Sequence, residues 1–407
     1  MSSQKKVLMM VYGFVPDDPR VITEARTITQ LGYRVDAIGT GFPNGYSGDY
    51  SRDNIQITII PIINKPSHIP RGILQLIKGK APQQTQPINP LPASNVISLI
   101  FFFLWILRLA LFRHYDLIHA HEHQTMPIGW LLATLKRIPW VYDAHEHVPE
   151  NRAHFKTFKA RMAVRTESFF LKRANTVITV GNRLAADLKD RGVKQVVIIG
   201  NWKPLEKYDI TADQLKTKHL DYQLQRFQLI VSFFGVLNEE RQVNILIESI
   251  KQLPHIGLLI AGKGELRELV INASQAHDNI IWLDWLPYDQ VPLHIMLSDV
   301  IYGCLYAEEG NARYMAPNKL FDAFAAGKAM LAKSGIGEIG QILEDENAAI
   351  LLDEVTPQTV SNALQQLTDN QDLLHQLQGN ALAASKKYNW GVAETRLMEL
   401  YSNLMNP

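Results

Sequence analysis

The chain alternates between short apolar runs and longer segments in which apolar residues recur with helical spacing. Helical patterns cover 19–31, 126–136, 153–173 and 182–191. Strands without polar alternation that are joined by helices indicate a parallel sheet covered on both faces. The runs that predict strands in this half of the chain are VLMMVY (7–12), RVDAIGT (34–40), IQITIIPI (55–62), DLIHAH (116–121), WVYDAH (140–145), TVITV (176–180) and QVVIIG (195–200).

The same pattern then starts again after a polar interval. Residues 201–228 show no strand pattern and are predicted to be a linker. At 407 residues and 46% apolar composition, the chain is long enough for two hydrophobic cores. We therefore predict an α/β protein with two Rossmann-like, doubly wound domains in tandem, over 1–200 and 229–387. The second set of predicted strands is 229–235, 256–262, 279–283, 299–304, 328–333 and 348–352.

Composition excludes several classes of protein. The net charge of +1 gives no excess of either sign that would suggest nucleic-acid binding. Cys304 is the only cysteine, which excludes an internal disulfide and a thiolate metal site. The first apolar run follows two lysines but is short and lacks a small-residue cleavage site, so we interpret it as a buried strand and expect a cytoplasmic protein.

One interval of the chain contains no acidic residue. It lies between Asp53 and Asp116 and contains a long predicted loop, 65–95, and an apolar run, 96–112. As a helix this run is about 26 Å long, shorter than the ~20 residues that a spanning helix needs. It is either a helix lying on the first sheet or, with the neighbouring lysines and arginines, part of a peripheral membrane-docking segment over 65–112 that faces an anionic leaflet.

The segment APNKLFDAF (316–324) predicts an anion site. In open parallel sheets, ligands bind beyond the carboxyl ends of the strands, and this segment follows one of them. We expect Pro317 at the first helical position, so that the amides of Asn318 and Lys319 point at an anion. Asn318 and Asp322 share one helix face, and a carboxylate suits a ribose diol. A nucleoside diphosphate fits both features, whereas a purely structural cap and a surface acid are the alternative.

Two further cations follow strands of the second domain. Arg241 lies after the first strand, and Lys263 lies between two glycines that permit close backbone approach. Either could neutralise a diphosphate, or each could be a solvated surface charge.

The histidines form two groups, His119/His121/His123 and His145/His147. Metal binding is disfavoured because the spacing places no third ligand and no Asp-x-Asp pair occurs. Two other interpretations are open. A neutral imidazole could form a hydrogen bond with a hydroxyl group of a ligand, or the histidines could simply be hydrogen-bonded within the protein at the strand ends. No Gly-x-Gly-x-x-Gly opens the first domain and no Walker lysine is present, which disfavours a dinucleotide enzyme.

In order and spacing, these segments resemble GT-B glycosyltransferases of glycosyltransferase family 4. The resemblance runs along nearly the whole chain, through 18–39, 116–121, 141–150, 235–250, 316–331, 335–343 and 388–404. It implies a nucleotide-sugar bound to the second domain, an acceptor on the first domain and chemistry in an interdomain cleft. It also implies a helix over 388–407 that packs back on the first domain.

The resemblance further implies a retaining transfer of a sugar to a hydroxyl acceptor, with a lipid-linked saccharide as one acceptor class. No bound metal or other cofactor is expected. A sugar-nucleotide epimerase or hydrolase of the same fold, and an inactive GT-B binding partner, are the alternatives.

Site residues follow from the same resemblance. Tyr314 stands where the family has the first acid of a Glu-x7-Glu motif, and Glu308 or Glu309 is a candidate substitute. Val236 stands where the family has one of two basic residues, so Lys263 or Lys319 is expected to supply the second charge. The implied catalytic residues are His145, Arg241 and Lys319; the donor-binding residues are Gly235, Lys263, Glu309, Pro317, Asn318 and Asp322; the acceptor-side residues are Asp18, Arg20, His121 and Glu146.

Overall fold

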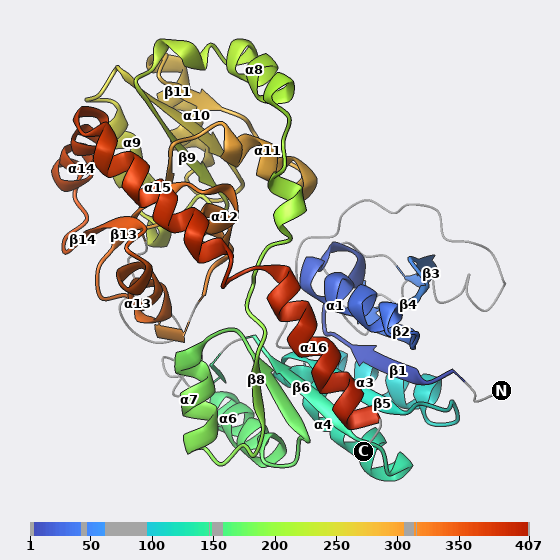
Figure 1. Cartoon of the computed structure of the whole chain (residues 1–407). Coiled ribbons are helices and arrows are strands. Elements are labelled where there is room, and N and C mark those ends of the chain that lie inside the picture. The colour runs from blue at the N-terminus through green and yellow to red at the C-terminus, as the bar shows by residue number, and fades with distance from the viewer. Residues whose placement is uncertain are drawn as a thin grey trace. The chain divides into compact units, whose positions relative to one another are not determined.

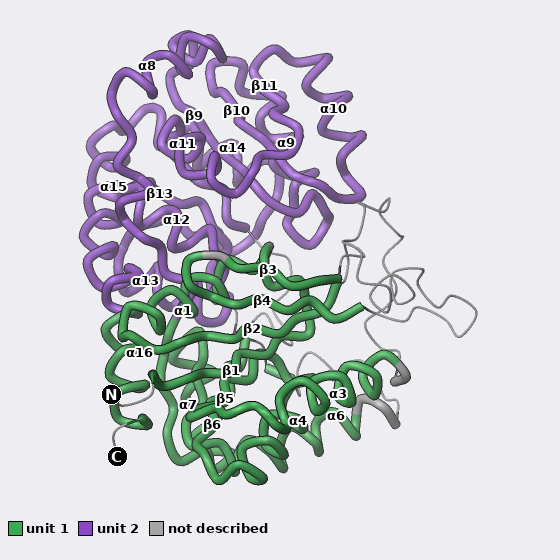
Figure 2. The backbone as a smooth tube through the Cα atoms, turned by 90° about the vertical axis from the view of Figure 1, so that its right-hand side faces the viewer, with its two compact units in different colours: residues 1–199, 394–407 green, residues 200–393 purple. Residues whose placement is uncertain are grey.

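The computed structural model divides into two compact units. Unit 1 contains residues 1–199 and 394–407, and unit 2 contains residues 200–393 (Figure 2). The residues described are 4–41, 47–61, 96–145, 147–148, 158–304, 313–314 and 316–405. The predicted loop 65–95 lies outside them.

Unit 1 is built on an eight-stranded sheet with the order β3-β4-β2-β1-β5-β6-β7-β8 (Figure 1). All neighbouring strands are parallel except β3 and β4. The order reverses between β1 and β5, so their carboxyl ends form a switch point where ligands bind in such sheets. The strands are β1 (Lys6–Met10), β2 (Arg34–Thr40), β3 (Gly48–Arg52), β4 (Ile55–Ile60), β5 (Leu117–His121), β6 (Trp140–Ala144), β7 (Thr176–Thr179) and β8 (Val196–Ile198).

Strand β3 is absent from the sequence prediction. Its residues are polar, and it pairs antiparallel with β4 through a two-residue turn. Asp53 and Asn54 in that turn have φ angles of 53° and 64°. Two consecutive residues with positive φ, often Asn or Asp, are typical of tight β-hairpins. The dipeptide Asp53-Asn54 is therefore the sequence feature that could have predicted this hairpin.

The helices of unit 1 cover both faces of the sheet. Helix α4 packs against both α3 and α6. Helix α16 contributes its residues from 394 onward to unit 1, where the Thr27 hydroxyl donates a 2.9 Å hydrogen bond to Glu394. The helices are α1 (Pro19–Gln30), α3 (Val96–Ala110), α4 (Glu122–Lys136), α6 (Phe158–Leu171), α7 (Asn182–Asp190) and α16 (Trp390–Met405).

Helix α3 is the apolar run of the acid-free interval. Phe102, Ile106 and Ala110 on one face are buried, as expected of a helix that covers a sheet. Ile100 and Leu104 on another face are 55% and 57% exposed. Within the part of the chain that the structure describes, no helix combines the length and apolar character needed to cross a membrane.

Unit 2 has a parallel six-stranded sheet with the order β11-β10-β9-β12-β13-β14. Its order reverses between β9 and β12, which creates a second switch point. The strands are β9 (Leu229–Phe234), β10 (Ile256–Ala261), β11 (Ile280–Trp282), β12 (Val300–Tyr302), β13 (Ala329–Lys333) and β14 (Ala349–Leu352). The helices are α8 (Ala212–Asp221), α9 (Val243–Ile250), α10 (Arg267–Ala276), α11 (Val291–Met296), α12 (Asn318–Ala326), α13 (Gly337–Glu346), α14 (Pro357–Asp369) and α15 (Gln371–Ser385).

Residues 201–228, predicted as a linker, belong to unit 2 instead. They contain α8, which begins with a capping box between Thr211 and Gln214. Leu224 is buried in a small core cluster with Ile230 and Leu259, which lie on β9 and β10. The sequence pattern missed this packing because the apolar residues reach the core singly, without strand or helix spacing.

Candidate functional site

Two glycine-rich loops meet at the switch point of unit 2. They follow β9 and β10, and the Leu237 amide in the first donates to the Lys263 carbonyl in the second at 2.9 Å. A Cβ atom on Gly262 would lie 1.7 Å from the Gly235 carbonyl oxygen, and both glycines have a φ of +151°. Only glycine fits there, so the loops form a backbone surface with little side-chain cover.

Lys319 of α12 lies over this surface. Its ammonium nitrogen donates to the Phe234 carbonyl and lies 3.9 Å from the centroid of the Phe233 ring. Burial and, after it, the positive charge of Arg241 lower the pKa of Lys319 to about 7, while Asp322 opposes the shift. A buried lysine whose protonation is opposed by a neighbouring cation marks a site that favours an anion.

Arg241 is the second cation of this pair. It lies in a 3-10 helix, Glu239–Arg241, whose capping residue Asn238 accepts a 3.1 Å hydrogen bond from the Arg241 amide. Its guanidinium makes no hydrogen bond or ion pair with any residue that the structure describes, and burial lowers its pKa. The charge is therefore held half-buried and available.

Lys263 and Lys319 were both candidates for the charge that Val236 lacks. The structure favours Lys319, because the field of Arg241 acts on it directly. Lys263 is exposed, and its ammonium group lies 4.6 Å from the centroid of the Trp285 ring. Val236 is 54% exposed, so an apolar side chain lies at the surface where the family pattern has a basic residue.

The start of α12 differs by one position from the prediction. Pro317 is the N-cap, with an extended ψ of 152°, and Asn318 is the first helical residue. Proline is compatible with either position because its φ of −70° suits both. Asn318 and Lys319 still lie in the first turn, whereas the Leu320 amide is already bonded to the Pro317 carbonyl at 3.1 Å.

Asp322 is not the surface acid of the alternative interpretation. It is 8% exposed, and its Oδ1 accepts a 2.5 Å hydrogen bond from Tyr208 and lies 3.2 Å from the Lys203 ammonium. Lys203 also donates to Asn318 Oδ1 at 2.8 Å. Sequence reasoning missed Lys203 and Tyr208 because both lie in the segment that was predicted to be a linker.

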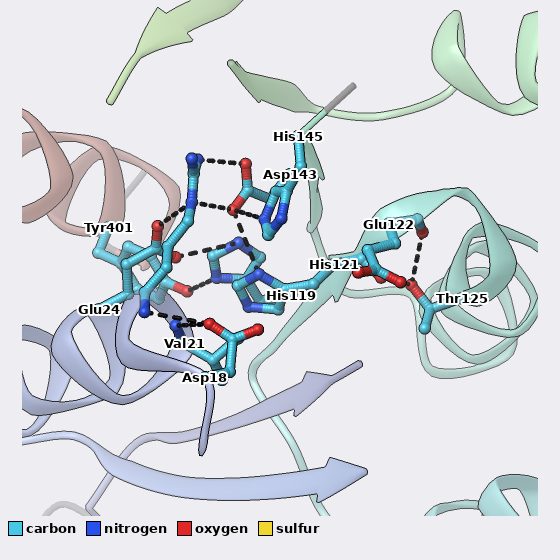
Figure 3. Close-up of polar contacts among 11 residues, drawn as sticks. Asp18, Val21, Glu24, His119, His121, Glu122, Thr125, Asp143, His145 and Tyr401 are labelled. Carbon is cyan, nitrogen blue, oxygen red and sulfur yellow. Dashed lines mark hydrogen bonds and ion pairs between the residues drawn. The ribbon is translucent and has the colours of Figure 1, made fainter. Parts of the chain in front are cut away.

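The switch point of unit 1 is centred on Asp143, the fourth residue of β6 (Figure 3). Arg20 donates to both of its carboxylate oxygens, from Nε at 2.9 Å and from the terminal nitrogen at 2.5 Å. His121 Nδ1 lies 3.2 Å and His145 Nε2 lies 2.8 Å from Asp143 Oδ2. Asp18 is the N-cap of α1 and accepts from the Arg20 and Val21 amides at 3.1 Å. Three of the predicted residues in unit 1, Arg20, His121 and His145, thus meet on one carboxylate.

The charges of this cluster shift its pKa values in opposite directions. Burial alone would raise the pKa of Asp143, but Arg20 and His145 hold it well below its ordinary value. Burial likewise favours neutral His145, yet the Asp143 carboxylate outweighs it and raises the His145 pKa. The pKa of His119 falls well below its ordinary value because it is buried beside His121. His145 is therefore the histidine best suited to carry a proton.

Glu24 and Tyr401 complete the cluster and were not predicted. Glu24 Oε1 accepts from Arg20 Nε at 3.1 Å, and Glu24 Oε2 lies 3.8 Å from His119 Nε2. The Tyr401 hydroxyl of α16 lies 2.8 Å from His119 Nδ1. Glu24 is four residues after Arg20 on α1, so helical spacing could have placed it on this face. No local signal points to Tyr401.

The sequence spacing places no third group beside the histidines, but the structure brings two carboxylates close to them. One donor atom each of Glu24, His119, His121 and Asp143 lie within 4.8 Å of one another, and all four residues are buried. The spacing in the sequence could not show this, because the carboxylates come from α1 and β6 rather than from β5. Glu146 and Glu309 lie outside the described residues, so their predicted roles remain predictions.

Comparison with known proteins agrees with this architecture. Residues 25–202 match the model of the glycosyl transferase 4-like domain, and residues 228–370 match the model of the glycosyl transferases group 1. A D-inositol 3-phosphate glycosyltransferase of Corynebacterium efficiens is 21% identical over 309 residues, covering 71% of each chain.

Solved structures of similar fold cover the whole chain. Sucrose-phosphate synthase from Thermosynechococcus elongatus has a TM-score of 0.73 at 15% identity, over 98% of this chain and 99% of its own. Anabaena Alr3699/HepE, solved in complex with UDP and glucose, has a TM-score of 0.71 at 16% identity, over 98% and 100%. The two matched domains, on two parallel-sheet units of this kind, show that the chain is a glycosyltransferase of the GT-B fold.

Proposed function

We propose that the protein transfers a sugar from a nucleoside diphosphate sugar to a hydroxyl group, with retention of the anomeric configuration and without a metal ion at the diphosphate. The observation that carries this proposal is the pair Lys319 and Arg241 over the glycine loops at the β9/β12 switch point. Two cations held half-buried beside the first turn of α12 match the charge of a diphosphate. The Anabaena protein, which shares the fold, was solved with UDP.

In this mechanism the protein stabilises the charge that develops on the leaving diphosphate. Lys319, Arg241 and the α12 amides supply fixed positive charge, so little reorganisation is needed as the glycosidic bond breaks. The leaving phosphate takes the proton of the acceptor hydroxyl as that oxygen attacks from the same side of the ring. The family resemblance assigns His145 to the donor sugar, and its bond to Asp143 fixes the ring orientation for that role.

Asp322 retains a role in nucleotide binding under this proposal. A carboxylate has about four lone-pair positions, and the two partners of Asp322 both contact Oδ1. Oδ2 is then the atom proposed to accept from the ribose diol. Lys203 and Tyr208 would hold the carboxylate in the required orientation before the nucleotide binds.

A ligand screen tests the donor assignment. Thermal denaturation is followed with UDP, GDP, ADP and their sugars, with and without EDTA, and the product formed with a panel of hydroxyl acceptors is examined by NMR. Stabilisation by one nucleotide, unaffected by EDTA, and a product with the donor's anomeric configuration are expected. Release of free sugar or of an epimer without acceptor would instead indicate the hydrolase or epimerase, and no nucleotide binding would indicate an inactive partner protein.

For the acceptor, we propose a lipid-linked saccharide reached from an anionic membrane surface. The docking surface lies on the adjoining helices α3, α4 and α6 and on the residues that directly follow each of them. The acids of these three helices are Glu122, at the start of α4, and Glu167, which is buried and paired with Arg191, while Arg113 lies 3.8 Å from Asp36 of β2. Exposed apolar and basic side chains together suit the interface of an anionic bilayer. Its exposed apolar residues are Ile100, Leu104, Phe112, Leu135, Met162 and Phe169, and its exposed basic residues are Arg108, Arg113, Arg137, Arg161, Arg165, Lys172 and Arg173.

A further inference from the structure

We propose that Glu24, His119 and His121 bind one divalent transition-metal ion, with zinc as the best match, and that Asp143, Tyr401 and Arg20 orient these ligands. The site lies wholly in unit 1, whereas the residues proposed to hold the diphosphate lie in unit 2. The proposal therefore goes beyond the proposed function and does not alter the metal-independent transfer step.

Three buried atoms converge without a partner. Glu24 Oε2, His119 Nε2 and His121 Nε2 have no hydrogen-bond partner among the residues that the structure describes, and all three side chains are 0% exposed. Buried polar atoms are nearly always paired, so three possible ligand atoms in one cluster indicate a site for a ligand that accepts lone pairs. Arg20 Nη1, a donor of the same cluster, also has no hydrogen-bond partner among the described residues. The atoms are two imidazole nitrogens and a carboxylate oxygen, which are the donors of a His2Glu zinc site.

The spacing of these groups is close to that of a metal site. Zinc bonds of about 2.0–2.2 Å place the ligand atoms of a tetrahedron roughly 3.4 Å apart. His119 Nε2 lies 3.8 Å from Glu24 Oε2, and one donor atom of each residue in the cluster lies within 4.8 Å of the others. His119 and His121 alternate on β5 and therefore point to the same face of the sheet. His119 Nε2 and Glu24 Oε2 are therefore already close to the spacing of two zinc ligands.

Each proposed ligand is also held through its other polar atom (Figure 3). The Tyr401 hydroxyl lies 2.8 Å from His119 Nδ1, and Asp143 Oδ2 lies 3.2 Å from His121 Nδ1. Arg20 Nε donates to Glu24 Oε1 at 3.1 Å. Histidines that bind a metal almost always use the second ring nitrogen in this way, toward a carboxylate or another acceptor, which fixes the tautomer.

The local charge is compatible with a divalent ion. Glu24 and Asp143 supply two carboxylates, and Arg20, which contacts both, supplies one positive charge. Because Tyr401 lies on α16 and Glu24 on α1, the ion would join these two helices to β5, which indicates a structural role.

Cobalt substitution tests the proposal independently of glycosyl transfer. Tag-free protein is dialysed against dipicolinate and titrated with Co²⁺ while visible absorption is recorded, and zinc content is measured by elemental analysis. One equivalent of metal per chain, d–d absorption bands and a higher melting temperature with Zn²⁺ are expected. Glu24→Gln and His119→Gln should lose the bands, whereas His294→Gln, at a buried histidine of unit 2 outside the cluster, should keep them.

A second variant guards against misfolding of the ligand variants. Tyr401→Phe retains the ring but removes the hydroxyl from His119, so metal affinity should fall by roughly 10–100-fold while the circular dichroism spectrum is unchanged. Absence of cobalt bands in the wild-type protein, as a cluster filled only by water would give, would refute the proposal. Equal bands in the wild type and in the folded Glu24 and His119 variants would also refute it, because the metal would then bind elsewhere.

Discussion

The Lys203 ammonium nitrogen lies 3.2 Å from Asp322 Oδ1, an oxygen that also accepts the Tyr208 hydroxyl proton. The acid on α12 is therefore a member of a buried ion pair within unit 2. Its proposed contact with the ribose and its contribution to folding can be separated by experiment, because its two contacts with Tyr208 and Lys203, among the residues that the structure describes, both use Oδ1.

Asp322→Ala should lower both stability and nucleotide affinity. The substitution leaves the Lys203 side chain, which is 5% exposed, without its carboxylate, so the free energy of unfolding should fall by about 3–5 kcal/mol. Tyr208→Phe removes one hydrogen bond to the same carboxylate and should cost about 1 kcal/mol. Urea denaturation measures both, and isothermal titration with the nucleotide from the ligand screen measures binding.

The binding results distinguish the two roles of Asp322. Tyr208→Phe should retain nearly full nucleotide affinity, since Oδ2 and Lys203 remain in place. If Asp322→Ala loses stability but binds the nucleotide as tightly as the wild type, the ribose assignment is wrong and the acid is only structural.

Arg241→Ala should reduce turnover by roughly 10²–10³-fold, similar to the loss of one preorganised donor at a developing negative charge. Steady-state kinetics with saturating donor measure this change. Arg267→Ala is the matched control, because the Arg267 side chain is 43% exposed and its ion pairs among the described residues are with the surface acids Glu268 and Asp284. Equal activity of both variants would exclude Arg241 from the transfer step.

Binding of the diphosphate should take up a proton at alkaline pH. The pKa of Lys319 is about 7, so the free protein holds this group mostly neutral at pH 8.5, and a bound diphosphate would raise the pKa again. Affinity should then decrease as pH rises from 7 to 9. Titration calorimetry in Tris and in HEPES, which differ in ionisation enthalpy, measures the proton uptake.

Lys319→Met is the control for that measurement, and it should abolish most of the uptake. The same group also affects stability. Its pKa is lower in the folded than in the unfolded chain, so the unfolded state binds more protons between about pH 7 and 10.5, and this group makes the unfolding free energy rise with pH there. A wild-type protein that binds the nucleotide without taking up a proton at pH 8.5 contradicts the contact with Lys319.

Removing apolar side chains from the docking surface should weaken membrane binding. Leu104→Ser with Phe112→Ser removes side chains that are 57% and 93% exposed, so folding should be little affected. Sedimentation with vesicles containing anionic lipid should show strong binding of the wild type at low salt, less at high salt, and several-fold less for the double variant. Leu220→Ser, a 58% exposed leucine on α8 of unit 2, serves as the control. Wild-type protein that stays in the supernatant at low salt would rule out this surface.

Most strands of both sheets were predictable because each is a short apolar run. The polar strand β3 was not, since its stability comes from pairing with β4 rather than from its own pattern. The proposed donor-side residues Arg241 and Lys319 could be named from the sequence because each follows a predicted strand. The residues that hydrogen-bond to the predicted site residues could not be predicted, because they come from remote parts of the chain. Tyr401 is 282 positions from His119, and Tyr208 is 114 positions from Asp322.

The division of helix α16 has a consequence for the order of folding. Unit 2 is one continuous stretch, 200–393, whereas unit 1 needs residues 394–405 to place Tyr401 beside His119. On the ribosome, the eight-stranded sheet emerges long before the helix that covers its histidines. The nascent N-terminal half must therefore wait, with that flank uncovered, until all of unit 2 has been translated.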